Sequence, residues 1–189
     1  CIAVEMCSAT LFMGREPDLV VSNTLFGDGA AAVVMQDTSS AKGSGRVTLL
    51  DVESILIPGY REQLRYRTED HRLRNVLSRK VPVIGAETTR QVVDNLLSRH
   101  GLNRKDIGWW AIHPGGPKVL DRVGEGLGLV EEQLVFSRQI LKNYGNMSSP
   151  SVLFVLEAIL ESKRPGKGDL GLLVSFGAGF TAHAALVRF

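Results

Sequence analysis

A histidine and an asparagine, residue types that take part in many enzyme reactions, stand at two similar junctions of the chain. His113 follows the apolar run 107–112, which predicts a short buried strand, and precedes Pro-Gly-Gly-Pro. Asn146 precedes Ser-Ser-Pro at 148–150, a sequence typical of a helix start. An amide NH₂ group is a neutral hydrogen-bond donor, and an imidazole ring can donate a hydrogen bond or carry a proton. The two junctions are therefore the candidate positions for chemistry.

The residues that follow each junction predict a helix that holds it in place. After the histidine, Gly115 and Gly116 have no side chains, so a ligand or another part of the backbone can come close. Pro117 has the φ angle of a first helical turn, and the apolar spacing predicts a helix over 118–127. After the asparagine, a second and strongly apolar helix is expected over 151–160.

Elsewhere the pattern alternates helices with strands, which predicts an α/β fold. The charged stretch 58–80 is expected to be a solvated face, and the Ala- and Val-rich stretch 27–35 a buried strand. A turn at Gly177-Ala178-Gly179 joins the last two strands. The other expected elements are strands over 1–6, 47–57, 169–175 and 180–189, a short helix within 15–24, an amphipathic helix over 87–100 and a surface loop over 37–46.

Length and composition fit one folded domain of ordinary size. The chain has 189 residues, of which 44% are hydrophobic and 22% charged, and its 22 basic and 20 acidic residues leave a net charge of +2. This balance gives no reason to expect binding to nucleic acid or to a membrane surface. No apolar run approaches the ~20 residues of a membrane-spanning helix, and no Cys/His set has the spacing of a metal site.

The cysteines and the first residue bear on the origin of the chain. Cys1 and Cys7 provide no disulfide framework, which favours a reducing cytoplasm. The sequence begins with Cys rather than Met, and no signal peptide is visible. We therefore expect a piece of a longer polypeptide, cut before Cys1.

Four motifs together resemble those of the type III polyketide synthases, the chalcone synthase family within the thiolase-like fold. The chain carries His-Pro-Gly-Gly-Pro at 113–117 and Gly-Asn-Met-Ser-Ser at 145–149, with the histidine and the asparagine 33 positions apart, similar to the family's spacing. Leu-Phe-Gly-Asp-Gly-Ala-Ala-Ala at 25–32 and Ser-Phe-Gly-Ala-Gly-Phe at 175–180 are close to two further family motifs. Glu-Met-Cys-Ser at 5–8 resembles bacterial members. The resemblance covers nearly the whole chain, but only the second half of the family's polypeptide.

This resemblance implies both a fold and an activity. The fold is the C-terminal half of the duplicated, layered α/β/α/β/α thiolase-like architecture, with residues 1–189 as a C-terminal chalcone/stilbene synthase-like domain. The activity is that of an acyltransferase that repeatedly condenses malonyl-CoA, with loss of CO₂, onto an acyl-CoA starter. The family also implies a cytoplasmic homodimer that needs no metal and no cofactor, since CoA thioesters are its substrates, and that binds neither nucleic acid nor membranes.

Within such an enzyme, His113 and Asn146 are implied to be the catalytic residues of this chain. Decarboxylation and condensation both build negative charge on a thioester oxygen, which two N–H donors can stabilise. His113 is also implied to pair, as an imidazolium, with a nucleophilic thiolate. The family's nucleophile lies upstream, so neither Cys1 nor Cys7 is expected to replace it. Cys7, expected within a strand, is either a small buried hydrophobe or a wall residue of the acyl cavity.

The resemblance also implies a set of substrate-binding residues. Phe26 matches a phenylalanine that gates the passage between the CoA tunnel and the acyl cavity, while a plain core role stays open for it. Gly115 and Gly116 would leave room for the pantetheine arm, and Ser148 would face the cavity. The turn Gly177-Ala178-Gly179 matches a family loop.

Two departures from the family pattern concern the substrate. Ala178 stands where the family usually has Pro, which leaves the turn less rigid. Asn75 stands at the position of a second gating phenylalanine of the plant enzymes, which favours a starter other than a phenylpropanoid. Some arginines of 58–80 are alternative candidates for contacts with CoA phosphates.

Other functions of the same or a different class stay open. An initiating ketoacyl synthase usually shows His-Gln-Ala-Asn, and a long-chain ketoacyl-CoA synthase His-Ala-Gly-Gly-Arg, so Pro117 and Met147 favour the polyketide synthase. A non-catalytic half that serves only in assembly is the alternative of another class, because the family's nucleophile is absent from these 189 residues.

Overall fold

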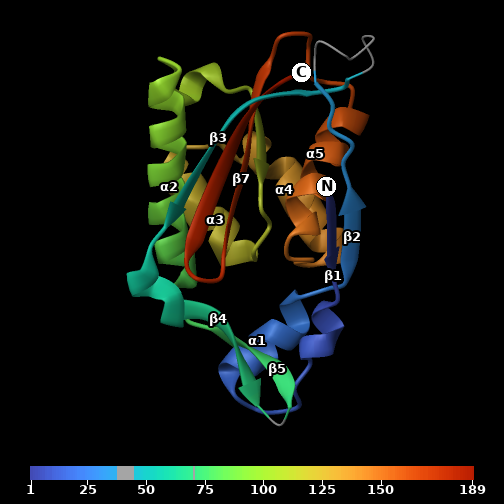
Figure 1. Ribbon diagram of the computed structural model, residues 1–189, viewed down its shortest axis with the longest axis vertical. Coiled ribbons are helices and arrows are strands. Elements are labelled where there is room, and N and C mark those ends of the chain that lie inside the picture. The colour runs from blue at the N-terminus through green and yellow to red at the C-terminus, as the bar shows by residue number, and fades with distance from the viewer. Residues whose placement is uncertain (38–44, 70) are drawn as a thin grey trace.

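The computed structural model describes residues 1–37, 45–69 and 71–189 (Figure 1). The loop expected over 37–46 lies almost entirely outside them. The helices are α1 (Pro17–Leu25), α2 (Val81–Arg99), α3 (Pro117–Leu127), α4 (Glu131–Tyr144) and α5 (Pro150–Glu161), with short 3₁₀ helices η1 (Cys7–Thr10), η2 (Pro58–Gln63) and η3 (Arg104–Asp106). The strands are β1 (Ile2–Glu5), β2 (Gly29–Ala32), β3 (Thr48–Leu56), β4 (Leu64–Glu69), β5 (Arg72–Leu77), β6 (Trp109–Ile112), β7 (Leu170–Gly177) and β8 (Thr181–Arg188).

A four-stranded sheet forms the centre of the molecule. Its order is β3-β8-β7-β6, and it is antiparallel except for the parallel pair β6–β7. Helices α2 and α3 cover one face, while α4 and α5 lie on the other side of the sheet (Figure 1). Because side chains alternate along a strand, Trp110 and Ile112 of β6 enter the core with α2 and α3, and Ala111 enters the core with α5. The predicted α/β fold is confirmed.

Two small sheets accompany the central one. The hairpin β4–β5 packs against α1 and η1, and these elements form the lower lobe in Figure 1. The expectation that 58–80 is a solvated face is wrong for β5, because contact with α1 buries Arg74 and Asn75. The Arg74 guanidinium is paired with Glu69 and Asp18, which compensates its loss of water.

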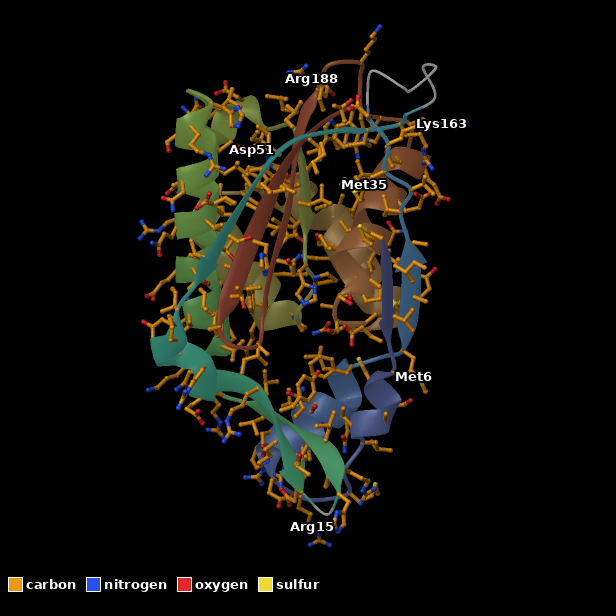
Figure 2. The ribbon with its side chains drawn as sticks, in the orientation of Figure 1. Met6, Arg15, Met35, Asp51, Lys163 and Arg188 are labelled. Carbon is orange, nitrogen blue, oxygen red and sulfur yellow. The ribbon has the colours of Figure 1, made fainter. Side chains whose placement is uncertain are left out.

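The second small sheet, β1–β2, is shorter and more exposed than expected. Only residues 29–32 of the predicted strand 27–35 pair with β1, and they alternate between half-buried and exposed, because α5 covers one face of the pair. Val34 beyond it is 93% exposed. Met6 and Met35, which Figure 2 labels at the two ends of this sheet, are also exposed.

Helices α2, α3 and α5 each have a proline at their first or second residue, and one of them begins much earlier than predicted. Helices α3 and α5 begin at Pro117 and Pro150, one residue before the predicted ranges 118–127 and 151–160. Helix α2 begins at Val81 instead of residue 87, because Pro82 lies in the first turn, where a missing N–H group breaks no hydrogen bond.

Helix α4 was not among the expected elements. The side chain of Gln133 accepts a hydrogen bond from the backbone N–H of Val130 at 3.1 Å, which satisfies one free donor at the helix start. Leu134, Ser137 and Ile140 form its buried face. Helix α4 leads directly into the loop that carries Asn146.

Candidate active site

His113 lies at the carboxyl end of β6, where its backbone N–H donates to the carbonyl oxygen of Val174 on β7 at 2.8 Å. This bond extends the parallel ladder by one residue and fixes the position of the histidine. The side chain is 8% exposed, and its ring contacts the ring of Phe176 edge to face, with 6.3 Å between the centroids. The position of the histidine is therefore fixed by its place at the end of β6 and by its contacts with Val174 and Phe176 of β7.

Burial determines the protonation state of this histidine. It lowers the pKa of His113 from its ordinary 6.5 to about 4. The ring is therefore neutral at pH 7 in this chain, with one N–H donor and one acceptor nitrogen. The expected imidazolium belongs to a pair with a nucleophilic thiolate and stays a prediction; without that partner, removal from water penalises the charged ring.

Asn146 is fixed by both its backbone and its side chain. Its backbone N–H donates to the carbonyl of Leu25 at 2.8 Å, and its carbonyl accepts from the N–H of Gly27 at 3.0 Å, which places Phe26 directly beside it. The side-chain oxygen Oδ1 accepts from the N–H of Ser148 at 2.8 Å. Because Oδ1 is occupied in this way, the NH₂ group has a defined direction.

The two junctions meet at Gly115. The Asn146 Nδ2 atom lies 3.4 Å from the carbonyl oxygen of Gly115, a long hydrogen bond. A Cβ atom on Gly115 would lie 3.4 Å from the His113 ring, so this glycine lies against the imidazole. Gly116, with φ of +144°, turns the chain into α3, which a residue with a side chain could do only under strain. The histidine loop and the asparagine loop are thus in contact at Gly115.

Ser148 and a turn that the resemblance singled out lie near these two loops. Ser148 is half-buried next to Asn146 and has a φ of +60°. The turn Gly177-Ala178-Gly179 begins one residue after Phe176, whose ring contacts His113. The Ala178 carbonyl accepts from the hydroxyl of Thr181 at 3.0 Å, and the Gly179 N–H donates to Leu64 at 3.4 Å. The turn therefore lies at the same end of the sheet as the histidine and close to β4.

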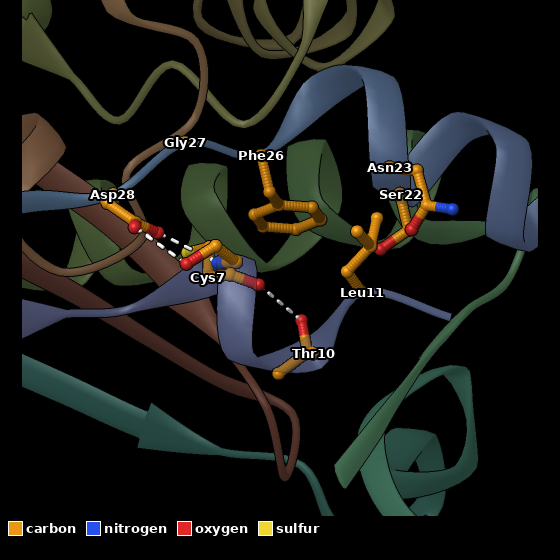
Figure 3. A pocket seen from close by; sticks show the side chains of 9 residues that line it. Cys7, Thr10, Leu11, Ser22, Asn23, Phe26, Gly27 and Asp28 are labelled. Atoms are coloured by element: carbon orange, nitrogen blue, oxygen red, sulfur yellow. Dashed lines mark hydrogen bonds between the residues drawn. The ribbon is translucent and has the colours of Figure 1, made fainter. Parts of the chain in front are cut away.

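A pocket of about 290 Å³ lies next to the asparagine junction, between η1, α1 and the residues just before β2 (Figure 3). Phe26 lines it, whereas His113 and Asn146 do not. The backbone of Phe26 also pairs with that of Asn146, so this residue connects the pocket with the asparagine loop. The sequence analysis missed most of the pocket. Thr10, Leu11, Ser22 and Asn23 line it and belong to no recognised motif, and Ser8 belongs to the Glu-Met-Cys-Ser stretch but was not singled out.

Cys7 lines the same pocket, but it lies in η1 and not in a strand as expected. The hydroxyl of Thr10 donates to the Cys7 carbonyl at 2.8 Å, a local bond that favours the turn over extended backbone. Burial, with smaller effects of Glu5 and Asp28, raises the pKa of the Cys7 thiol to about 11. A thiol that stays protonated at neutral pH is a poor nucleophile.

In residues 1–37, 45–69 and 71–189, no group of three or more His, Cys, Asp and Glu side chains could hold a metal ion. No helix in the part of the chain that the structure describes is long and apolar enough to cross a membrane.

Comparison with known proteins agrees with this architecture. The fold is that of the thiolase-like enzymes: the chain superposes on 1,3,6,8-tetrahydroxynaphthalene synthase from Streptomyces coelicolor A3(2), a bacterial type III polyketide synthase, with a TM-score of 0.90 and 30% identity, covering 100% of this chain and 53% of that one. Residues 49–189 match the family described as chalcone and stilbene synthases, C-terminal domain. The chain belongs to this family.

Curated relatives include bacterial enzymes. The chain is 38% identical over 189 residues to 1,3,6,8-tetrahydroxynaphthalene synthase from Streptomyces peucetius subsp. caesius, and 37% identical over 194 residues to 3,5-dihydroxyphenylacetyl-CoA synthase from Streptomyces toyocaensis. Each match covers 100% of this chain and 50% of the relative. The chain thus spans about half the length of the curated relatives it matches, and the predicted resemblance to the C-terminal half of bacterial type III polyketide synthases is confirmed.

Proposed function

We propose that the polypeptide containing this chain is a type III polyketide synthase, an acyltransferase that condenses malonyl-CoA with an acyl-CoA starter. The observation that carries the proposal is the meeting of His113 and Asn146 at Gly115, two uncharged N–H donors held by separate loops. Decarboxylation and condensation both place negative charge on a thioester oxygen, and fixed donors aimed at such an oxygen are a strong source of catalysis.

In the first step, the bond between the malonyl carboxylate and its α-carbon breaks, and CO₂ leaves. The electron pair stays on the α-carbon and the thioester oxygen as an enolate, which accepts hydrogen bonds from Asn146 Nδ2 and the His113 ring. In the second step, the α-carbon attacks the carbonyl carbon of an enzyme-bound acyl thioester. A carbon–carbon bond forms, the carbon–sulfur bond breaks, and the cysteine leaves as a thiolate.

The neutral state of His113 suits this role. A ring with a pKa of about 4 keeps one N–H donor at neutral pH without a competing charge, and it takes up no proton from the surrounding solution. Cys7 does not supply the thiolate in this proposal, because its raised pKa makes that thiol a poor nucleophile.

The remaining assignments belong to the same proposal. Phe26 limits the passage between the pocket and the two donors, Gly115 and Gly116 leave room for the pantetheine arm, and Ser148 faces the substrate. Gly177-Ala178-Gly179 borders the acyl cavity. The enzyme is proposed to act as a cytoplasmic homodimer and to need no metal or cofactor beyond its CoA thioester substrates.

The test is product formation by the full polypeptide that contains this chain. Purified protein is incubated with malonyl-CoA and a panel of acyl-CoA starters, and free CoA and products are followed by chromatography and mass spectrometry. We expect a pyrone or phenolic product with at least one starter. Well-folded protein that yields no product with any starter would favour the alternative of a non-catalytic half.

A further inference from the structure

Gly85 lies inside helix α2, where a glycine is normally unfavourable. Glycine destabilises a helix interior relative to alanine, because it loses more backbone freedom on folding. The residue is buried, and its backbone has the ordinary helical conformation, which any residue with a side chain adopts. Neither helix propensity nor backbone geometry therefore explains the glycine at this position.

The ring of Phe176 on β7 provides the reason. A Cβ atom at position 85 would lie 2.6 Å from Cζ and 2.7 Å from Cε1 of this ring, much closer than two carbon atoms approach without a bond. The ring thus occupies the space that a side chain of residue 85 would need. The glycine lets β7 place the ring directly against the backbone of α2.

The same ring contacts His113. The two rings meet edge to face, with 6.3 Å between their centroids. Phe176 also stacks on the fully buried ring of Phe180, with 5.4 Å between the centroids and 12° between the planes. Because Phe180 and α2 confine the ring of Phe176, a displacement of this ring at Gly85 is transmitted to the imidazole.

Packing has to orient the imidazole, because hydrogen bonds do not. Within the described residues, the ring nitrogens of His113 make no hydrogen bond, and Phe176 and Gly115 lie against the ring. The backbone next to Phe176 fixes that side chain only in part, since Ala178 in the following turn does not restrict φ as a proline would. The place of the Phe176 ring therefore depends on the groups around it, and Gly85 is one of them.

We propose that Gly85 is a positioning residue for His113 that acts through the ring of Phe176. Without a side chain at residue 85, the ring takes the place in which its contact with the imidazole directs a ring N–H toward the thioester oxygen. A Cβ atom at this position displaces the ring and turns the imidazole, and a misplacement on the order of 1 Å at a reacting centre costs about 10²-fold in rate. The inference rests on the proposed function, because it takes His113 to be a donor to the enolate.

The first test is a double-variant cycle on malonyl-CoA decarboxylation by the full polypeptide. Gly85→Ala adds the Cβ atom, Phe176→Leu shortens the side chain that this atom meets, and a third variant combines both. We expect Gly85→Ala to lower kcat by about 10–10²-fold with KM for malonyl-CoA within about twofold, because the donor is misdirected while the binding surfaces stay in place. In the Phe176→Leu background, the same substitution should change kcat by less than about twofold, because the overlap is gone.

Gly126→Ala is the matched control for the helix. Gly126 lies in α3, and its new Cβ atom would lie 3.6 Å from the Cβ of Ala86 on α2, an ordinary contact. Both substitutions replace a helical glycine by a better helix former, so helix propensity changes equally in the two variants. Gly126→Ala should keep kcat within about twofold of the unmodified protein.

The second test observes the histidine itself by nuclear magnetic resonance. The full polypeptide is labelled with ¹³C at Cε1 of its histidines, and the signal of His113 is assigned by its absence in His113→Gln. An aromatic ring shifts the resonances of the protons beside it. Gly85→Ala should therefore move the His113 signal and leave the other histidine signals in place, and Gly126→Ala should move none of them.

Three results would overturn the proposal. They are an unchanged kcat in Gly85→Ala, an equal loss of kcat with and without Phe176→Leu, and an unmoved His113 signal in Gly85→Ala. If Gly85→Ala does not fold, the combined variant gives the answer. It should fold, because Phe176→Leu removes the overlap, and a combined variant that also fails to fold would refute the contact on which the proposal stands.

The role of Gly85 and the proposed function fail separately in this design. A polypeptide that never decarboxylates malonyl-CoA, but in which Gly85→Ala moves the His113 signal, would refute the proposed function and keep the positioning of His113 by Gly85. A polypeptide that decarboxylates malonyl-CoA equally fast with and without Gly85→Ala would refute the role of Gly85 alone.

Discussion

Asn146 Nδ2 lies 3.4 Å from the carbonyl oxygen of Gly115, and this contact joins the loop after β6 to the loop before α5. The side-chain oxygen of the asparagine is held by Ser148, so the amide presents its NH₂ group toward the histidine loop. The histidine is thus set by the unit β6–loop–α3 and the asparagine by the unit α4–loop–α5, and the positions of the two loops depend on each other. Changes in either loop are expected to affect both donors.

The geometry at Gly116 provides a first test of this loop. We predict that Gly116→Ala destabilises the protein by about 1–3 kcal/mol, because its φ of +144° is strained for a residue with a Cβ atom and that atom would lie 3.4 Å from Leu25. The free energy of unfolding is measured in urea. Gly59→Ala, where the new Cβ meets no atom within 4 Å, is the matched control; equal stability of the two variants would argue against the strain.

The buried ring of His113 predicts a pH dependence of stability. Its pKa is about 4 in the folded chain against an ordinary 6.5, so between these values the unfolded chain takes up a proton that the folded chain does not. Its contribution of up to about 3 kcal/mol is therefore fully present above pH 6.5 and is lost as the pH falls toward 4. Urea unfolding at a series of pH values measures it.

In this experiment His113→Gln should flatten the stability profile between pH 6.5 and 4. His71→Asn serves as the control, because His71 is exposed in the hairpin turn and Asn tolerates its φ of +61°. If the pH dependence of stability persists in His113→Gln and disappears in His71→Asn, the titrating group is His71 and the prediction is wrong.

The 189 residues alone are predicted to fold but not to condense malonyl-CoA. The Cys7 thiol, with a pKa raised to about 11, is almost entirely protonated at neutral pH, and acyl transfer needs the thiolate. The protein is offered a radiolabelled starter-CoA and then analysed by mass spectrometry. Stoichiometric acylation of Cys1 or Cys7, followed by chain extension, would show that the nucleophile assignment is wrong.

A flexible starter is predicted to be a better substrate than an aromatic one. Asn75, where the plant enzymes have a second gating phenylalanine, offers a buried amide and no aromatic surface to pack against a coumaroyl ring. The kcat/KM values for a mid-chain acyl-CoA and for coumaroyl-CoA, measured with the full polypeptide, decide the matter. A clear preference for coumaroyl-CoA would refute the prediction.

The sequence predicted best those elements that a short stretch of residues specifies. The helices at Pro117 and Pro150 and the strand before His113 follow from proline and apolar patterns, and these place both donors at helix starts. The contact between Ser22 and Asn75 could not be foreseen, because it joins residues 53 positions apart that share no motif. Such a contact depends on how the hairpin packs on α1, which no short stretch specifies.

The errors have equally local causes. The amphipathic helix was predicted to begin at residue 87, although Pro82 lies in its first turn, where proline is well tolerated. The burial of β2 was overestimated because an Ala-rich strand has the same composition at a sheet centre and at an exposed edge.

The central claim is that His113 and Asn146 stabilise the enolate together, and malonyl-CoA decarboxylation tests it most directly. The rate of ¹⁴CO₂ release is measured for the full polypeptide and for His113→Ala and Asn146→Ala, with the exposed residues His71 and Asn95 changed to Asn and Ala as controls. The account predicts a loss of about 10²–10³-fold in each site variant, the scale of one oxyanion donor, with the controls unchanged. Unmodified decarboxylation rates in both site variants, in protein that is still folded, would contradict it.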